Sequence, residues 1–91
     1  MTDHMTGCLA RSLAGHDKDT IYVIVKESAK TVHLVDGRIR TLDRPKCKKK
    51  KHIQIINITD ETLSKKLIQE LPVTDEEIKY FIKCYEKKIN Q

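Results

Sequence analysis

A short, strongly basic stretch is the main chemical feature of this sequence. Six positive charges fall within eight residues, with no acidic residue among them: Arg44, Lys46, Lys48, Lys49, Lys50 and Lys51. Like charges at this density repel one another unless an anion neutralises them, and phosphate is the commonest such anion. The stretch therefore predicts a basic phosphate-binding loop over residues 44–52. The alternative is a solvated lysine tract that binds nothing specific.

Charge composition points to nucleic acid as the partner. The chain has 18 Lys and Arg against 13 Asp and Glu, a net charge of +5. Residues 1–58 hold 12 basic and 6 acidic residues, whereas residues 59–91 hold 6 and 7. A basic domain of this kind favours nucleic acid or an acidic membrane surface. We do not expect a membrane partner, because the sequence has no lipidation motif or strongly basic amphipathic helix.

Other cations extend the predicted interface beyond the basic stretch. Arg38 and Arg40 alternate with Ile39, so both are expected on one sheet face beside the loop. Arginine suits bidentate phosphate contacts, and lysine acts as a point charge. Only four aromatic residues are present, so backbone recognition of structured RNA is favoured over base stacking. The predicted RNA-binding residues are Arg11, Lys18, Arg38, Arg40, Arg44, Lys46, Lys48, Lys49, Lys50, Lys51 and His52.

The remaining reactive residues do not form a motif for metal binding or catalysis. Cys8, Cys47 and Cys84 are odd in number and far apart, which argues against a disulfide framework. Cys47 and His52 lie five residues apart, but there is no Cys-x-x-Cys or paired-histidine motif. The glycines are isolated, so no phosphate-cradling loop is present. We expect no metal, no cofactor and no enzymatic activity.

The start of the chain has no features of a signal peptide. Its first fifteen residues include Asp3, His4 and Arg11 and lack an apolar run. No stretch approaches the roughly eighteen apolar residues of a membrane span. A cytoplasmic location is therefore expected, with residues 1–6 as a flexible N-terminus.

Five short strands are expected to position the basic residues, over residues 7–12, 20–25, 31–35, 38–42 and 52–56. The β-branched run at 20–25 is typical of a strand covered on both faces. Asp36-Gly37 predicts a tight type I′ hairpin turn between the third and fourth strands. Pro45 would end the fourth strand, because proline has no N–H for a sheet ladder. Short strands at this spacing favour a small barrel or rolled sheet.

Two helices are expected to follow. Thr59 or Asp60 can cap the first helix, and Pro72 would end it. Its apolar stripe consists of Leu63, Leu67 and Leu71. The sequence Thr74-Asp75-Glu76-Glu77 is a capping box for the second, with Val73 and Ile78 at the hydrophobic-staple positions. Its apolar stripe is Ile78, Phe81, Ile82, Tyr85 and Ile89.

Two parts of the sequence resemble a known family. Residues 12–18, Ser-Leu-Ala-Gly-His-Asp-Lys, followed by the apolar strand, resemble a KOW motif. Leu-Val-Asp-Gly at 34–37, the loop rich in Arg, Pro and Lys, and His52 resemble the bacterial KOW-domain RNA-binding proteins. Those proteins are related to the archaeal and eukaryotic large-subunit ribosomal proteins L-fourteen-e, L-six-e and L-twenty-seven-e. The resemblance covers residues 7–58.

The resemblance implies a small SH3-like barrel without catalysis that binds RNA, typically ribosomal RNA. Gly15 would be the motif glycine and Lys18 the basic residue at the loop tip, while Asp36 and Gly37 would shape a structural turn. Asp19 departs from the pattern, since a second glycine is usual there.

We therefore predict a mainly β fold: a five-stranded SH3-like barrel over residues 7–58, then a helical pair over 59–91. The predicted function is non-catalytic RNA binding. The alternatives are a protein-interaction module of the translation or transcription machinery, docking through the barrel or the second helix, and a nonspecific DNA binder.

Overall fold

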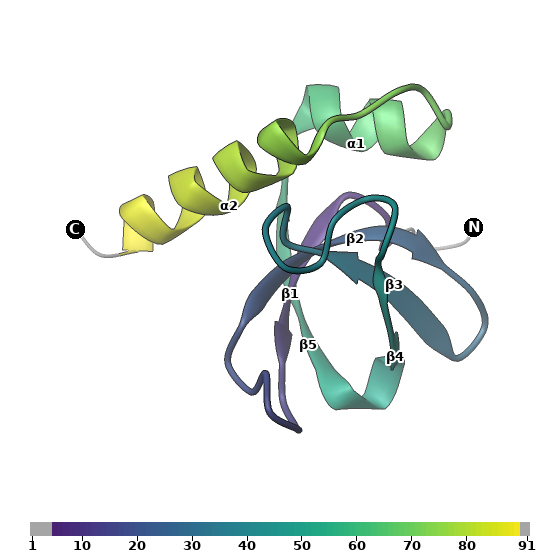
Figure 1. Cartoon of the computed structure of the whole chain (residues 1–91), viewed down its shortest axis with the longest axis vertical. Coiled ribbons are helices and arrows are strands. Elements are labelled where there is room, and N and C mark those ends of the chain that lie inside the picture. The colour runs from purple at the N-terminus through teal and green to yellow at the C-terminus, as the bar shows by residue number, and fades with distance from the viewer. Residues whose placement is uncertain (1–4, 90–91) are drawn as a thin grey trace.

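The computed structural model describes residues 5–89, which form one antiparallel sheet followed by helices (Figure 1). The strand order is β4-β3-β2-β1-β5. The strands are β1 (Cys8–Ser12), β2 (Ile21–Glu27), β3 (Thr31–Val35), β4 (Lys46–Lys49) and β5 (Ile53–Thr59). A three-residue 3-10 helix, η1 (Lys50–His52), joins β4 to β5. The α-helices are α1 (Glu61–Ile68) and α2 (Asp75–Ile89).

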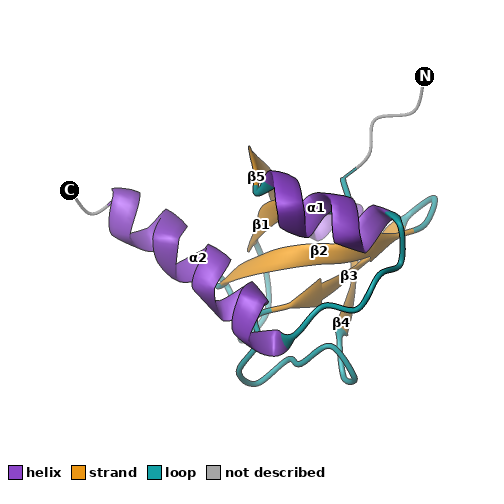
Figure 2. Cartoon of the chain, turned by 90° about the horizontal axis from the view of Figure 1, so that it is seen from above, coloured by secondary structure: helices purple, strands orange, loops and turns teal. Residues whose placement is uncertain are grey.

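The sheet buries side chains on both faces. The inner face, which no helix covers, holds one cluster: Cys8, Ala10, Tyr22, Ile24, Val32, Leu34 and Ile53. The outer face packs under the helices (Figure 2); its cluster is Leu9, Ile21, Val23, Val35, Leu63, Ile78 and Ile82. Alternate residues of β2 enter the two clusters, which confirms the prediction that this strand is covered on both faces.

The sheet curls strongly without closing. β4 and β5 are its opposite edges, yet only the three residues of η1 separate them along the chain. Lys49 and Ile53 are four residue steps apart, which span about 14 Å at most, so the two edges must come close at this end. Within residues 5–89 no ladder pairs β4 with β5. The predicted five-stranded antiparallel sheet is confirmed, whereas the closed SH3-like barrel is not.

The fourth strand is not where the sequence predicted it. Residues 38–42 form a turn-rich loop, because the Asp36 carboxylate accepts the backbone N–H groups of Arg38 and Arg40, each at 2.9 Å. β4 instead arises within the predicted basic loop, with Leu34 opposite Lys46 and Thr31 opposite Lys49. Lysine is a common residue on edge strands, since its charge discourages pairing with another chain.

The two helices begin as the sequence predicts. The Asp60 side chain accepts the Leu63 N–H at 2.9 Å and caps α1. The Thr74 hydroxyl accepts the Glu77 N–H at 3.3 Å, and Glu77 accepts the Thr74 N–H at 3.4 Å, which confirms the capping box.

The end of α1 differs from the prediction. The helix stops at Ile68 and Glu70 takes a positive φ of 57°, so the chain turns away before Pro72. Leu71 consequently lies outside the helix and is 49% exposed. The prediction that Leu71 belongs to the apolar stripe of this helix is therefore wrong.

Candidate nucleic-acid interface

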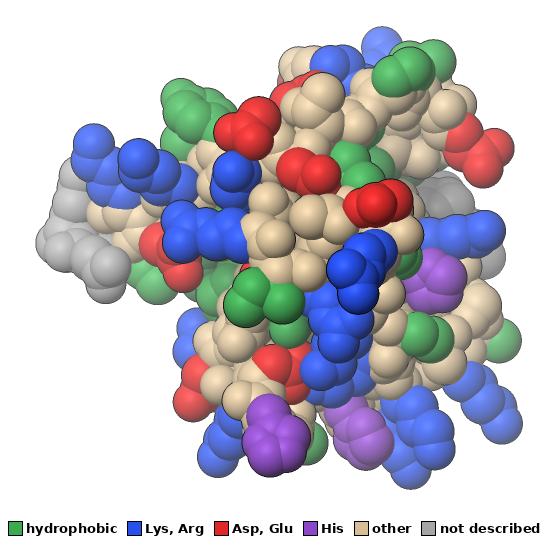
Figure 3. Space-filling view, in the orientation of Figure 1, with side chains coloured by type: hydrophobic (Ala, Val, Ile, Leu, Met, Phe, Trp, Pro, Cys, Tyr) green, Lys and Arg blue, Asp and Glu red, His purple; other side chains and the backbone are tan. Residues whose placement is uncertain are grey.

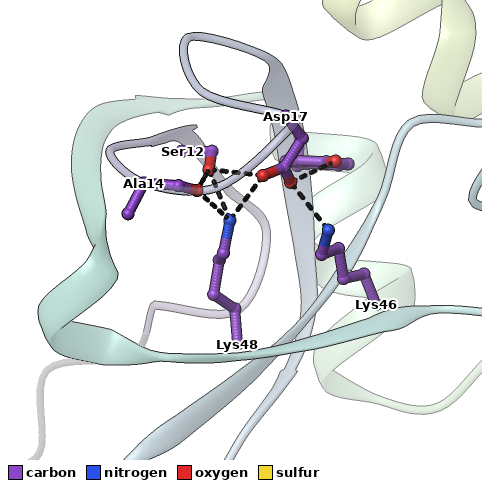
Figure 4. Close-up of polar contacts among 6 residues, drawn as sticks. Ser12, Ala14, Asp17, Lys46 and Lys48 are labelled. Atoms are coloured by element: carbon purple, nitrogen blue, oxygen red, sulfur yellow. Dashed lines mark hydrogen bonds and ion pairs between the residues drawn. The ribbon is translucent and has the colours of Figure 1, made fainter.

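One carboxylate binds two lysines of the basic stretch. Asp17, in the loop between β1 and β2, lies 2.7 Å from the Lys48 Nζ and 3.2 Å from the Lys46 Nζ (Figure 4). It also accepts the Tyr22 hydroxyl at 2.7 Å and the Ser12 hydroxyl at 3.0 Å. These residues, which we call the Asp17 cluster, join the edge strand β4 to the far end of β1.

The Asp17 cluster is largely buried, so its role is to stabilise the fold and not to bind a ligand at the surface. The side chains of Lys48 and Asp17 are only 10% and 14% exposed. Burial alone would raise the pKa of Asp17, but hydrogen bonds from Lys48, Tyr22, Lys46 and Ser12 outweigh it and hold that pKa well below its usual range. Lys48 also donates to Ser12 Oγ and, at 2.9 Å, to the Ala14 carbonyl. The Lys48 ammonium group thus links β4 to the end of β1 and the loop that follows it, across the curled sheet.

A second carboxylate binds Lys50. Glu27 Oε2 lies 3.2 Å from the Lys50 Nζ, and Glu27 Oε1 accepts the Met5 N–H at 2.7 Å. Burial raises the pKa of Glu27, but these hydrogen bonds and the lysine charge lower it overall. The same contacts fix Met5 and Thr6, while residues 1–4 of the predicted flexible start lie outside the described residues. Three cations of the basic stretch are therefore bound to acids of the protein itself.

The other cations of the basic stretch face solvent. Residues alternate along β4, so Lys49 points to the face opposite Lys48 and is exposed, as is Cys47. Lys51 and Arg44, which flank the strand, are exposed too. Figure 3 shows Lys and Arg side chains gathered over the part of the molecule where β4 lies.

Three further basic residues, absent from the predicted set, lie beside these cations. His33 of β3 is opposite both Cys47 of β4 and Lys26 of β2, which places the three side chains in one row. The Lys50 N–H donates to the Lys30 carbonyl at 2.9 Å, so Lys30 in the β2–β3 turn adjoins η1. The alternation of Thr-Val-His-Leu-Val could have revealed His33, but placing Lys26 and Lys30 required the strand register.

These residues define one surface, which we call the cationic face. It occupies the part of the outer sheet face beyond Val35, where the helix-covered cluster ends. The strand register places Lys26, His33 and Lys49 on it. We count three basic residues of the adjoining segments with them: Lys30 of the β2–β3 turn, Arg44 just before β4 and Lys51 of η1.

The remaining predicted residues are spread more widely. Arg11 is half-buried on β1, opposite Ile21 and Gln54, and two strands separate it from β4. Arg38 and Arg40 lie in the β3–β4 loop. His52 is half-buried in η1, and its carbonyl accepts the Leu13 N–H at 2.9 Å.

The loop between β1 and β2 turns at two residues with positive φ, one of which is an aspartate. The Lys18 N–H donates to the Gly15 carbonyl at 3.2 Å, and Lys18 is exposed. Gly15 has a φ of 91°, and Asp19 has a φ of 74°. Asp19 therefore adopts the backbone conformation that glycine favours, and the loop turns there without a glycine.

Three structural features bear on other classes of function. Within residues 5–89 no three His, Cys, Asp or Glu side chains are grouped so that they could hold a metal ion. The helices of this described part are all too short or too polar to span a membrane. The described cysteines are free thiols, with Cys8 buried and Cys47 and Cys84 exposed.

Comparison with known proteins gave no relative from which site residues could be transferred. No protein-family model matches the chain, and no curated protein sequence matches it.

Proposed function

We propose that this protein is a non-catalytic RNA-binding module that contacts the phosphate backbone of structured RNA, with ribosomal RNA as the expected target. One observation carries the proposal. After the three ion-paired lysines are set aside, exposed lysines from two strands, a turn and η1, together with Arg44, still lie on or beside the cationic face. Within residues 5–89, none of the cationic-face residues forms an ion pair. A surface of unneutralised cations attracts a polyanion.

The positions of the aromatic side chains favour backbone recognition. Tyr22 is buried in the inner cluster, and Phe81 and Tyr85 pack partly against the outer one. Tyr80 is exposed, but it lies on α2. Among residues 5–89, no aromatic side chain is therefore available on the cationic face for stacking with bases. Contacts to phosphates and recognition of RNA shape must supply the affinity.

The fold supports the KOW-like part of the proposal. The strand order, the strong curl and the 3-10 link between the edge strands fit an SH3-like small barrel. The glycine-like conformation of Asp19 fits the position where the KOW motif has its second glycine. On this proposal the protein acts in the cytoplasm as part of the translation machinery.

The helix stripe is a weaker candidate for a protein-docking surface. Ile78 and Ile82 are 0% and 8% exposed, because α2 uses them to cover the sheet. A partner could reach them only if α2 left the sheet. Burial of these two central isoleucines thus favours RNA over docking through this helix, although Ile89 at its end is 53% exposed.

Charge-matched variants test the proposal. In K49Q/K51Q two exposed cations of the face are lost, whereas K65Q/K87Q removes two exposed lysines from the helices. Binding of a structured RNA hairpin would be measured by fluorescence anisotropy across a salt series. We expect the first variant to reduce the log–log salt slope by about 1.5, because each phosphate contact contributes roughly 0.7–0.9. The helix variant should bind like the parent protein.

Two results would contradict the proposal. Equal weakening by both variants would mean that net charge, and not the cationic face, drives association. Equal affinity for duplex DNA and structured RNA would instead favour the nonspecific DNA binder.

A further inference from the structure

The loop that replaces the predicted fourth strand has a locked backbone. Asp36 accepts the N–H groups of Arg38 and Arg40 through one carboxylate oxygen. In return, the N–H groups of Asp36 and Gly37 donate to the Arg40 carbonyl at 2.9 and 3.1 Å. We call residues 36–40 the arginine loop. Four hydrogen bonds around five residues give it one defined shape.

The arginine loop is also fixed to α2. A Cβ atom on Gly37 would lie 2.6 Å from the Asp75 carbonyl oxygen and 2.7 Å from the Lys79 side chain, so backbone and helix are in close contact. The Asp75 carboxylate accepts the Leu42 N–H at 2.8 Å, just beyond the loop. The N-terminal part of α2 therefore packs against the arginine loop and holds it in place.

This rigid support holds an apolar side chain out in water. Ile39 is 84% exposed, compared with 70% for Tyr80 and 53% for Ile89. A single exposed apolar residue is ordinary on a protein surface. Ile39 differs because it sits in a locked turn with an arginine on each side.

The two arginines have different surroundings. Arg38 lines a recess of about 260 Å³ whose other charged side chains are of both signs: Lys79 and Lys83 of α2 are basic, and Asp19, Asp36 and Glu86 are acidic. Arg40 lies close enough to Tyr22 of the Asp17 cluster for its charge to oppose the rise in the tyrosine pKa. In Figure 3, blue side chains gather along α2 and, separately, over β4. The arginine loop lies between α2 and the β4 side of the sheet (Figure 1).

We propose that the arginine loop is an insertion element for RNA, in which Ile39 packs against an unstacked base at a bulge or internal loop while Arg38 and Arg40 contact the flanking phosphates. This inference rests on the proposed RNA-binding function. Apolar side chains flanked by cations act as wedges between bases in other nucleic-acid complexes. A helix that is already interrupted costs less to open, and its unpaired bases are accessible.

The test compares two RNA hairpins that differ only by one bulged 2-aminopurine. The variants are I39S and, as a control, I68S, which makes the same change at an isoleucine of α1 that is 50% exposed. The parent protein should prefer the bulged hairpin and change the 2-aminopurine fluorescence on binding. I39S should reduce the preference about tenfold and remove the fluorescence change, because the buried apolar contact is lost. I68S should change neither.

The outcomes separate the two proposals. If I39S keeps both the preference and the fluorescence change while K49Q/K51Q still weakens binding, the insertion element is wrong and the RNA-binding function stands. The insertion element is also overturned if the parent protein binds both hairpins equally. If the parent protein binds neither hairpin at low salt, both proposals fail.

Discussion

Neighbouring lysines in one strand have different roles. Lys48 is 10% exposed and bound to Asp17, whereas Lys49 points to the other face and is exposed. Their residue type is the same, so only the pleat and the position of a carboxylate 31 residues away distinguish them. A substitution of the whole lysine run would mix a loss of stability with a loss of surface charge.

Single substitutions should separate these roles. K48M leaves Asp17 buried with one lysine partner fewer, and we expect the free energy of unfolding to fall by roughly 3 kcal/mol. K49M changes an exposed side chain, and its effect should stay within about 0.5 kcal/mol. Urea denaturation followed by circular dichroism measures both. Similar stability of K48M and K49M would show that the Asp17 cluster does not support the fold.

The Asp17 cluster also predicts how stability depends on pH. Because the pKa of Asp17 is lower in the folded protein, its contribution is complete above the unfolded value of about 3.9 and is lost as the pH falls below it. The loss is at most about 1.4 kcal/mol per pH unit for this group. Thermal melts from pH 6 to pH 2 should therefore show a steeper decline for the parent protein than for D17N, which is less stable at neutral pH. Parallel curves would exclude this linkage.

Among the elements, those defined by local contacts could be predicted from the sequence. Thr74 and Glu77 are three residues apart, and their capping box formed as expected because it depends only on that spacing. The alternation of Arg38 and Arg40 was misleading, since the Asp36 carboxylate satisfies their N–H groups within the loop. β4 could not be predicted, because lysine has a low strand propensity. It forms only because its backbone pairs with β3, a contact that the local sequence does not reveal.

Gly37 should be the most sensitive glycine of the two loops. It has a φ of 79°, and a methyl group there would collide with the α2 backbone. Gly15 has a similar φ of 91°, but its nearest atom, an Asp17 oxygen, is 3.4 Å away. We expect G15A to cost about 1 kcal/mol of unfolding free energy, and G37A clearly more, because strain and collision add. Chemical denaturation of both variants checks this order. Equal costs would mean that the loop yields easily to the added methyl group.

At the scale of the whole molecule, the position of the helices decides which surface is open. α1 and α2 cover the outer sheet face around Val23 and Val35 and leave the row from Lys26 to Cys47 exposed. The excess of positive charge in residues 1–58 correctly indicated a basic sheet region. It could not indicate that Asp17 and Glu27 form ion pairs with three of the lysines, since those ion pairs join residues 23 to 31 positions apart.

The pairing of β1 with β5 also constrains the order in which the chain can fold. Arg11 lies opposite Gln54, so this ladder joins residues 43 positions apart, the difference between 54 and 11. Contacts over such separations form slowly, because loop-closure entropy is lost before they contribute. On the ribosome, β1 would leave the exit tunnel well before its second neighbour, β5, emerges from it. One side of a central strand would stay unpaired during that interval, so the nascent chain is most exposed to misfolding just before β5 appears.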